Sequence, residues 1–597
     1  MTKFNDEQKL AIEFHTGAAG IVAGAGSGKS TVLLNRIKNL VEVHNEPQNS
    51  ILAISFTRKT ADELEKKLSK MGLGDVNVGT FHSICGRILV QEGITLKLIQ
   101  DWQVANYLKS VDKNVDIDDV KSFISYQKNH NKTFTDKFIP KDSLYNENEL
   151  RVFFKKYETM KSKAGLCDFD DYLTMCLDIL QKNKGKYTYE FILVDEHQDS
   201  CLVQNMILQE LCQSGNMFCL YDPRQAIYSW RAGNIEYCIN FDKYWENPTI
   251  INLYKNYRSA KNIVNNANKF IKPYFKNYEH YVDSEAHNQS DGEITIRTYG
   301  TREIEGVEVV DKIEELIEQG EKLSEIAVLY RMNLHSSFVE NELKRRGIDY
   351  EITNDSGFFK LKEVEAILSY LRLLHNPHDD QAFETVFRSR NYPLKYLKND
   401  MLDKAKHYSG LHDISTYEAF VTMEVSEAKH KRSIREFENS INKLRLQVDR
   451  EASVITLISN IVKSFNIDSG IRENYSNNDE INDRLNSIDV LKSFVKGNNL
   501  EQFITYVYSN NTKKKSKKNS VKLMSIHSSK GLEWNNCFLI GIEDGKFPHE
   551  KSGLDEEARL LYVGITRSKE NLYISQIGLG ESGRGNQFIL EYFGDIK

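Results

Sequence analysis

The residues that decide the fold of this chain run from Gly20 to Thr31 and read GIVAGAGSGKST. The apolar run from Ile21 to Ala23 predicts a short buried strand, and the VLLNRIKNLVEV that follows the stretch predicts a helix. Glycines at positions 24, 26 and 28 fill the interval between the two. This order of strand, glycine-rich loop and helix is the one that a phosphate-binding P-loop requires, and the spacing disfavours a chance glycine-rich turn.

Each residue type in this loop fits the binding of a nucleoside triphosphate. Glycines let backbone N–H groups turn toward phosphate oxygens, and the start of the helix adds the positive end of its dipole. Lys29 is placed to reach the β and γ phosphates, and the Ser30 hydroxyl is placed to bind Mg²⁺. Ala23 stands where the usual pattern has glycine, which costs little in ordinary strand geometry. The predicted nucleotide-binding residues of the loop are Ala23, Gly24, Ala25, Gly26, Ser27, Gly28, Lys29, Ser30 and Thr31.

Composition narrows the class of protein. With 597 residues, 40% of them hydrophobic and 27% charged, the chain should form about four structural units of a globular protein. It has no apolar run near the ~18 residues that cross a bilayer and no signal-peptide pattern, so we expect a cytoplasmic protein without a membrane partner. Its eight cysteines form no C-x-x-C pair, which predicts free, mostly buried thiols. The net charge of −6 means that any DNA contact must come from a local basic and aromatic surface.

A second chemical signal follows the apolar run from Phe191 to Val194. This run predicts a buried strand, and it ends in the adjacent carboxylates of Asp195 and Glu196. A strand that delivers such a pair beside a P-loop predicts that Asp195 binds Mg²⁺ and that Glu196 acts as the base toward the attacking water. Acidic pairs are common on protein surfaces, but the preceding buried strand favours the functional interpretation.

A third signal follows the strand predicted from Met217 to Tyr221. Gln225 is placed to sense the γ-phosphate, because it follows this strand by a few residues. The same loop contains two aromatic rings on which DNA bases could stack, Tyr228 and Trp230, and a cation for a DNA phosphate, Arg231. Further on, Arg258 in the segment NYRS is a candidate cation for the charge of the transition state.

Other segments allow two interpretations each. Gln8 has an amide that suits an adenine edge, although a solvated surface glutamine is the more common case. The lysine-rich, aromatic-containing segment 86–165 predicts an inserted helical unit, whose lysines and aromatics fit either single-stranded DNA or a solvated face. The like-charge run 511–520 fits either a flexible hinge or a DNA contact. The strand predicted over 51–56 leads into a helix that starts near Thr57, and a third predicted strand ends at Thr80–His82, where ligands bind in open α/β sheets.

Taken together, these segments resemble the UvrD/Rep/PcrA type of superfamily 1 DNA helicase over nearly the whole chain. The motifs that carry the resemblance are AGAGSGKS, GTFHS, VDEHQD, QAIYSWR, NYRS, IHSSKGLEW and LLYVGITR. The resemblance implies an α/β fold with two RecA-like parallel-sheet P-loop domains, each interrupted by a mainly helical insertion. The implied boundaries are 1–85 with 166–262 for the first domain, 86–165 for its insertion, 263–376 with 520–597 for the second domain, and 377–519 for a helical insertion with a basic hinge.

The resemblance also implies roles for single residues. Gln8 matches the adenine-reading glutamine, Arg258 and Arg567 match two arginine fingers, and Glu533 matches an acidic residue near the nucleotide sugar. The implied catalytic residues are Lys29, Asp195, Glu196, Gln225, Arg258 and Arg567, with Ser30 and Asp195 on Mg²⁺. The positions implied to lie along single-stranded DNA are Phe56, Thr57, His82, Tyr228, Trp230 and His527, to which Arg231 is added as a phosphate contact.

The implied activity is ATP-dependent translocation 3′→5′ on single-stranded DNA, with strand separation at junctions with duplex DNA, in DNA repair, replication or recombination. The alternative is an ATP-gated DNA-binding subunit of a repair, plasmid, phage or antiviral defence complex, whose unwinding is weak or depends on a protein partner. The sequence shows three departures from the family pattern, of which the first two leave the catalytic groups intact and only the third bears on unwinding. They are His197 in place of the usual Phe, Asp222-Pro223-Arg224 before Gln225, and a shortened second insertion. With about 30 residues after Arg567, neither a fused nuclease domain nor a long C-terminal tail is expected.

Overall fold

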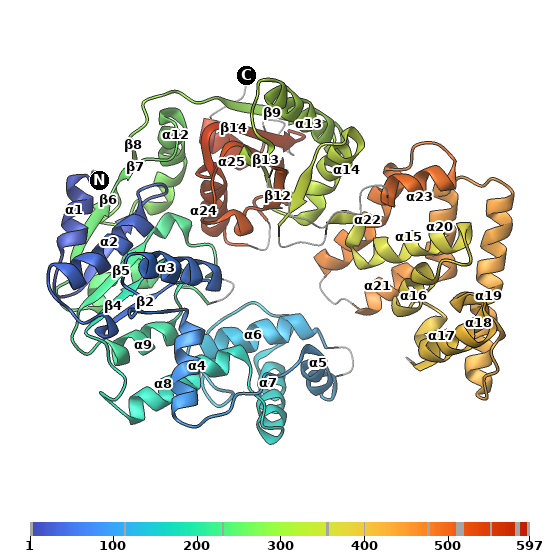
Figure 1. The fold of residues 1–597 in the computed structure, drawn as a ribbon, viewed down its shortest axis with the longest axis horizontal. Helices are drawn as coiled ribbons and strands as arrows, with labels where there is room; N and C mark the ends of the chain where they lie inside the picture. The colour runs from blue at the N-terminus through green and yellow to red at the C-terminus, as the bar shows by residue number, and fades with distance from the viewer. Residues whose placement is uncertain are drawn as a thin grey trace. The chain divides into compact units, whose positions relative to one another are not determined.

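The computed structural model describes residues 4–112, 115–229, 232–353, 357–398, 400–474, 478–508, 519–549, 552–579 and 585–593. The chain forms two compact units (Figure 1). The first consists of Met1–Gly300 with Ile526–Lys597, and the second consists of Thr301–Ser525. Each unit combines helices with parallel strands, so the predicted α/β fold is confirmed.

The first unit is built on a six-stranded sheet in the order β3-β2-β4-β5-β1-β6. Each neighbouring pair of these strands is parallel. The strands are β1 (Ala19–Ala23), β2 (Ile51–Ile54), β3 (Asn77–Gly79), β4 (Phe191–Val194), β5 (Met217–Tyr221) and β6 (Thr249–Leu253). All residues of β1, β2, β4 and β5 are buried, as expected for parallel strands that are covered on both faces. The strands predicted at 21–23, 191–194 and 217–221 are therefore confirmed. The strand predicted over 51–56 ends at Ile54, and the prediction that the third strand ends at Thr80–His82 is wrong, because it ends at Gly79 and Thr80 caps the helix α4 (Phe81–Gln91).

Three helices cover one face of this sheet, and their placement orients the P-loop. They are α1 (Asp6–Glu13), α2 (Lys29–Glu42) and α3 (Arg58–Lys70). Their apolar residues, such as Ile12, Leu33 and Leu68, share one core with alternate strand residues such as Ile21 and Leu193. Asn5 caps α1 through a capping box and Thr57 caps α3, as the residue types predict. Also in this unit are α9 (Leu202–Leu211), α10 (Glu236–Ile239) and α11 (Phe241–Tyr244).

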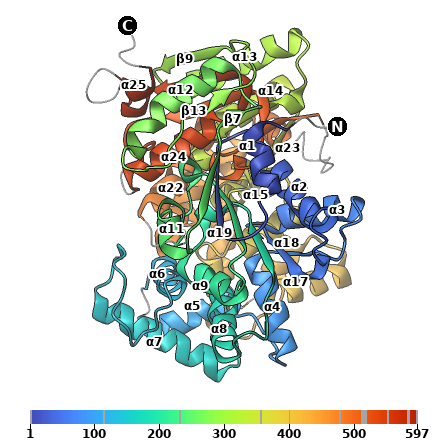
Figure 2. The same ribbon diagram turned by 90° about the vertical axis from the view of Figure 1, so that its left-hand side faces the viewer.

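Five helices gather at one end of the first sheet in both views (Figures 1 and 2). They are α4 (Phe81–Gln91), α5 (Asp101–Lys109), α6 (Ile117–Asn129), α7 (Glu147–Lys163) and α8 (Phe169–Lys182). Phe123, Phe153, Phe154 and Tyr157 are buried in a core of their own. The segment 86–165 was predicted to present its aromatic residues either to single-stranded DNA or to solvent. Both interpretations are wrong for these four, because their spacing along the helices places them on inward faces.

Two lysines of the same segment are also buried, although lysines at such positions were expected to face DNA or solvent. Lys128 Nζ lies 2.7 Å from Asp168 Oδ1, and Lys161 Nζ lies 2.8 Å from Asp171 Oδ2. Glu158, Asp168 and Asp171 lie close enough together to resemble a metal site. Each of the two ammonium groups already pairs with all three carboxylates, so the cluster is a salt-bridge network that ties α6, α7 and α8 together.

The rest of the first unit contains a second set of parallel strands. In it β14 (Ser568–Ile577) pairs with β13 (Trp534–Ile542) and with β9 (Ile294–Tyr299). The accompanying helices are α12 (Lys261–Ile271), α24 (Leu554–Ile565) and α25 (Gln587–Phe593). A short pair, β7 (Lys255–Asn256) with β8 (Glu285–Ala286), joins the segment after β6 to the polar stretch before β9. All eight cysteines are free and buried, as predicted.

The second unit has an α/β part and a helical part. In the α/β part, β12 (Val521–Ser525) pairs in parallel with β10 (Ile326–Tyr330) and β11 (Tyr350–Ile352), beside α13 (Arg302–Glu318) and α14 (Ser336–Arg346). The helical part has one large core. Its helices are α15 (Lys362–His375), α16 (Asp380–Arg388), α17 (Asp400–His412), α18 (Thr416–Thr422), α19 (Ala428–Asp449), α20 (Val454–Ser464), α21 (Ile467–Asn474), α22 (Asn478–Ser493) and α23 (Leu500–Tyr508). Most of the basic run 511–520 lies outside the described residues. Among the helices that the structure describes, none is long and apolar enough to cross a bilayer.

A buried carboxylic acid in α14 makes the stability of the second unit depend on pH. Glu340 accepts hydrogen bonds from the Phe358 backbone N–H at 2.9 Å and from the Tyr350 hydroxyl at 3.3 Å. Burial raises the pKa of Glu340 to about 7, although these donors and Lys344 oppose the rise. Burial also lowers the pKa of Lys344 to about 8. The folded state therefore binds more protons at Glu340 than the unfolded chain does between about pH 4.5 and pH 7, and stability is lost as the pH rises through this window.

Glu340→Gln should raise the melting temperature at pH 8 and should have much less effect at pH 5. The amide keeps the acceptor for Phe358 but removes the charge, which at pH 8 costs on the order of 3 kcal/mol at ~1.4 kcal/mol per pKa unit. Thermal melts of both proteins at the two pH values test this. An equal difference at pH 5 and pH 8 would show that the carboxyl does not titrate as described.

Candidate functional site

The P-loop has the geometry that phosphate binding requires. Gly26 and Gly28 have φ angles of 68° and 85°, in the left-handed region that favours glycine, and Gly28 is the N-cap of α2. A Cβ on Gly26 would lie 2.6 Å from Cβ of Arg258, so a side chain there would displace this arginine. The Ser27 hydroxyl is buried without a hydrogen-bond partner among the described residues, and no described side chain caps α2. These unsatisfied donors fit the phosphates of a nucleotide.

Gln8 lies against this loop and is only 6% exposed, so its interpretation as a surface residue is wrong. Its Nε2 donates to the Ser27 carbonyl at 3.0 Å, and its Oε1 accepts from the Asn5 backbone N–H at 3.2 Å. Both ends of the amide are therefore bonded to protein, which fixes the side chain beside the nucleotide loop. Sequence reasoning placed Gln8 near the nucleotide but did not predict this contact with the P-loop.

The acidic pair and the P-loop lysine meet at one edge of the first sheet, although β5 separates the strands β4 and β1 that they follow. Lys29 Nζ lies 2.9 Å from Glu196 Oε1. Burial would raise the pKa of Glu196, but Lys29 and Lys530 hold it well below its usual range. Burial, and next the charge of Glu196, raise the pKa of Asp195 to about 6. Glu196 itself has a left-handed φ of 53°, which turns it back toward Lys29.

The positions expected to bind Mg²⁺ suit that ion. Ser30 lies in the first turn of α2, exposed, and Asp195 follows β4. Hydroxyl and carboxylate oxygens are the ligands that Mg²⁺ prefers, and a divalent cation would offset the crowding of negative charge at Asp195 and Glu196. The donor set therefore fits Mg²⁺.

His197 replaces an aromatic residue without disturbing this pair. The ring is fully buried and packs near Tyr221 and Phe241, with ring centroids 6.5 Å and 6.3 Å away. Its Nδ1 lies 3.2 Å from the Ser200 hydroxyl. Burial lowers the pKa of His197 to about 4, so the ring is neutral near pH 7 and takes the place of an apolar side chain.

Gln225 connects the first sheet to the C-terminal part of the first unit. Its Oε1 accepts from Arg567 Nη2 at 3.2 Å, and its Nε2 donates to Asp222 Oδ2 at 2.7 Å. Arg567 is 1% exposed, and burial together with the nearby Arg258 lowers its pKa to about 9. The structure thus brings two of the predicted catalytic residues, Gln225 and Arg567, into direct contact.

Arg258 lies between the P-loop and Glu533. Its Nε lies 2.6 Å from Glu533 Oε2, and its Nη1 donates to the Thr566 carbonyl at 3.0 Å. The backbone N–H of the neighbouring Tyr257 donates to the Gly26 carbonyl at 2.9 Å, and the Tyr257 side chain is 40% exposed. Tyr257 was missed from the sequence, although its place in NYRS next to Arg258 could have indicated it.

Lys530 is the second residue that sequence reasoning missed, and it joins the acidic pair to the predicted DNA contacts. Its ammonium group lies 2.5 Å from Asp199 Oδ2 and 3.4 Å from Glu196 Oε2, and it donates to the Gln225 carbonyl at 2.9 Å. The same group lies 5.3 Å from the centre of the Tyr228 ring. A lysine in the motif IHSSKGLEW was a visible signal, but only the fold shows what it contacts.

Three of the residues predicted to lie along DNA form an aromatic row. The Phe56 and Tyr228 rings stack with centroids 5.4 Å apart, and the His527 ring lies 6.5 Å from Tyr228. Thr57, next to Phe56, is exposed and caps α3. All three residues are partly exposed, and accessible aromatic rings suit base stacking. Trp230 and Arg231 lie outside the described residues.

His82 belongs to a different contact, at the start of α4. Its ring meets the Phe169 ring edge-on at 6.1 Å, and Phe169 is 62% exposed at the start of α8. An exposed phenylalanine at a helix start is a further stacking face of the kind that single strands use. The sequence CDFDDYL gave no sign of it, because the periodicity of α8 does not separate an exposed aromatic from a buried one.

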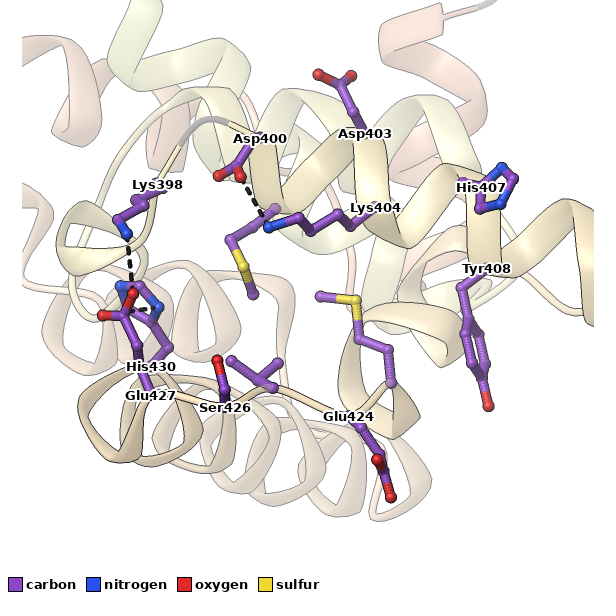
Figure 3. A pocket seen from close by; sticks show the side chains of 13 residues that line it. Lys398, Asp400, Asp403, Lys404, His407, Tyr408, Glu424, Ser426, Glu427 and His430 are labelled. Carbon is purple, nitrogen blue, oxygen red and sulfur yellow. Dashed lines mark hydrogen bonds and ion pairs between the residues drawn. The ribbon is translucent and has the colours of Figure 1, made fainter.

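The second unit contains a groove lined by charged and apolar side chains. It measures about 660 Å³ and lies between α17 and the segment before α19 (Figure 3). Four of its charged side chains form two ion pairs: Lys398 lies 2.8 Å from Glu427, and Lys404 lies 2.8 Å from Asp400. It has no part in the nucleotide site.

The P-loop, the acidic pair and the buried arginines define a P-loop nucleotide-binding protein. The sequence matches the UvrD/REP helicase N-terminal domain over residues 4–246 and the UvrD-like helicase C-terminal domain over residues 251–578. The chain therefore belongs to the UvrD/REP helicase family.

Three relatives from bacteria illustrate the similarity. The chain is 31% identical to the ATP-dependent DNA helicase PcrA of Bacillus subtilis, over 96% of this chain and 83% of that protein. It is 29% identical to DNA helicase II of Haemophilus influenzae, again over 96% and 83%. It is also 29% identical to the ATP-dependent DNA helicase Rep of Buchnera aphidicola, over 96% of this chain and 94% of that protein.

Lys530→Met should destabilise the first unit, because it leaves the buried Asp199 without its partner. Breaking a buried ion pair from one side typically costs ~3–5 kcal/mol. The double variant Lys530→Met with Asp199→Asn should lose less stability than the sum of the two single changes, since it leaves no uncompensated charge. Denaturant unfolding of the four proteins measures this coupling, and strictly additive losses would contradict the pairing.

Proposed function

We propose that this protein is an ATP-dependent DNA helicase that moves 3′→5′ along single-stranded DNA and separates duplex strands. Its relatives are named as DNA helicases, and two of them as ATP-dependent, which favours this function over the subunit alternative. The observation that carries the proposal is Lys530, because one ammonium group contacts both Glu196, at the nucleotide site, and the Tyr228 ring, in the aromatic row.

The nucleotide-binding step belongs to the P-loop and its neighbours. The backbone of Gly24–Gly28 and the start of α2 would hold the phosphates, with Lys29 neutralising their charge. Ser30 and Asp195 would hold Mg²⁺, which supplies charge stabilisation for the phosphoryl group when bound. We propose further that Gln8 and Tyr257 lie along the base, because both contact the loop and one of them offers an exposed ring.

The hydrolysis step is assigned to Glu196. Its carboxylate is held ionised by Lys29 and Lys530, so it can accept a proton from the attacking water. Lys29 would exchange its contact with Glu196 for the phosphates when the nucleotide enters. This exchange releases one carboxylate oxygen toward the reacting phosphate, so that binding of the nucleotide itself prepares the base.

Two arginines are placed to meet the charge that develops on the phosphates. Arg258 is now bonded to Glu533, and Arg567 is bonded to Gln225. Both guanidinium groups would turn from these protein acceptors to phosphate oxygens, as arginine fingers do. Glu533 would then be left beside the sugar of the nucleotide.

Coupling to DNA follows from the position of Lys530. A base that stacks on Tyr228 changes the surroundings of the ammonium group 5.3 Å away, and that group also contacts the Gln225 carbonyl and Glu196. DNA bound at the aromatic row would thus alter the electrostatic field at Glu196 and at Gln225.

The DNA that we expect this protein to bind is single-stranded DNA and its junctions with duplex DNA. The cytoplasmic location, the domain boundaries and any protein partner remain predictions.

Strand displacement on duplexes with a 3′ or a 5′ single-stranded tail tests the proposal. The wild type should separate the 3′-tailed duplex in the presence of ATP and Mg²⁺ and should leave the 5′-tailed one paired. Glu196→Gln, which keeps the shape of the side chain but not the base, should bind ATP without turnover and without displacement. ATP hydrolysis stimulated by DNA with no displacement of either duplex would support the subunit alternative instead.

Tyr228→Ala should weaken binding to single-stranded DNA by about 5- to 150-fold, because base stacking contributes ~1–3 kcal/mol. Hydrolysis without DNA should change little. The matched control is Tyr187→Ala, since Tyr187 precedes β4 and therefore lies at the opposite edge of the sheet from the P-loop. Fluorescence polarisation with labelled oligonucleotides measures both variants, and equal effects would exclude Tyr228 from the DNA surface.

A further inference from the structure

The departure Asp222-Pro223-Arg224 forms a buried ion pair directly before Gln225. Asp222 is fully buried and Arg224 is 4% exposed. The guanidinium Nε of Arg224 lies 2.8 Å from Asp222 Oδ1, and the Arg224 backbone N–H donates to the same oxygen at 3.2 Å. Pro223 begins the short 3-10 helix Pro223–Gln225, and its fixed φ turns the chain so that Arg224 folds back on Asp222.

Asp222 is also the residue that orients the Gln225 amide. Its second oxygen, Oδ2, accepts from Gln225 Nε2 at 2.7 Å, while Gln225 Oε1 accepts from Arg567 Nη2. A carboxylate only accepts and a guanidinium only donates, so these two partners fix which end of the amide is which. These two bonds use only one of the two N–H groups of the amide.

A second branch of this network leads to the proposed base. The Asp222 backbone N–H donates to Gln198 Oε1 at 3.0 Å, and Gln198 Nε2 donates to Glu196 Oε2 at 2.5 Å. Hydrogen bonds through Asp222 therefore connect the proposed base Glu196, the proposed sensor Gln225 and the arginine Arg567. The position of this aspartate depends in turn on the cation that neutralises it.

Arg224 is held rigidly by its surroundings, including the P-loop. Its guanidinium lies 5.8 Å and 5.6 Å from the ring centres of Tyr281 and Tyr562, and Nη1 lies 3.3 Å from the Ser284 hydroxyl. A Cβ built on Gly24 would lie 2.6 Å from Nη2, so the side chain occupies the space that the glycine leaves open. The ion pair is thus packed against the loop that binds the phosphates.

We propose that Arg224 is a positioning residue that acts through Asp222 to aim the Gln225 amide at the γ-phosphate. The proposal rests on the function proposed above. Without Arg224 the buried Asp222 carboxylate would lack its counter-charge, and Arg567 is a cation already bonded to Gln225. Loss of Arg224 would draw Arg567 toward Asp222 and turn the amide, which misplaces both groups at once.

A double-mutant cycle on hydrolysis tests this role. Arg224→Met should lower kcat by about 10- to 100-fold, the usual cost of a small misplacement at a reacting centre, with KM for ATP changed by less than about threefold. Arg224→Lys, which keeps the charge, should recover most of the loss. In a Gln225→Ala background, Arg224→Met should have almost no further effect on kcat, because the residue through which it acts is already gone. Independent, multiplicative losses in the double variant would overturn the proposal and leave Arg224 as a structural ion pair.

A binding measurement separates this proposal from the proposed function. Arg224→Met should bind ADP as tightly as the wild type but should bind ADP with aluminium fluoride, which imitates the transferring phosphate, at least about tenfold more weakly. Equal losses for both ligands would overturn the positioning role. If Arg224→Met fails to fold in a thermal melt, the same cycle is run with Arg224→Lys, for which a smaller but equally non-additive loss is expected. A wild type that binds both ligands but hydrolyses no ATP with DNA would contradict the helicase function and leave this test intact.

Discussion

The contact on which the site depends is the ion pair between Lys29 and Glu196. It joins the first turn of α2 to the second residue after β4, and so connects the ends of two strands that are separated by β5 in the sheet. Both groups are partly withdrawn from water, so each strongly affects the other. Because nucleotide phosphates would compete for Lys29, the same pair that completes the site in this structure is the one that ligand binding would rearrange.

Other charged side chains at the site also contact protein partners that a ligand could replace. Arg258 is bonded to Glu533, Arg567 to Gln225, and Lys530 to Asp199. Buried cations need partners, since an unpaired charge in a low-dielectric environment is costly. Internal acceptors hold the arginines in place until phosphate oxygens are available. The arrangement allows charged groups to be pre-positioned near the nucleotide without leaving any of them uncompensated.

The departures from the family pattern are accommodated in different ways. His197 behaves as a neutral ring in an apolar environment, so it substitutes for an aromatic side chain by losing its charge. Arg224 cannot do the same, because a guanidinium stays protonated, and it is instead paired with Asp222. The first departure adds no charge near pH 7 beside Asp195 and Glu196, the predicted catalytic pair. The second introduces a cation into the network that contains Gln225.

The sequence by itself determined the parallel α/β fold, the P-loop and the order of the acidic and basic motifs, because strand periodicity and glycine spacing are local properties of the chain. It did not determine the contacts of Lys530 and Arg224 or the burial of Gln8, since each depends on residues far away in sequence. It also misjudged four aromatic residues of segment 86–165, Phe123, Phe153, Phe154 and Tyr157, because the sequence did not show which side of each helix would be covered. Tertiary structure decided these points, because only packing fixes which polar groups lose water and must find partners.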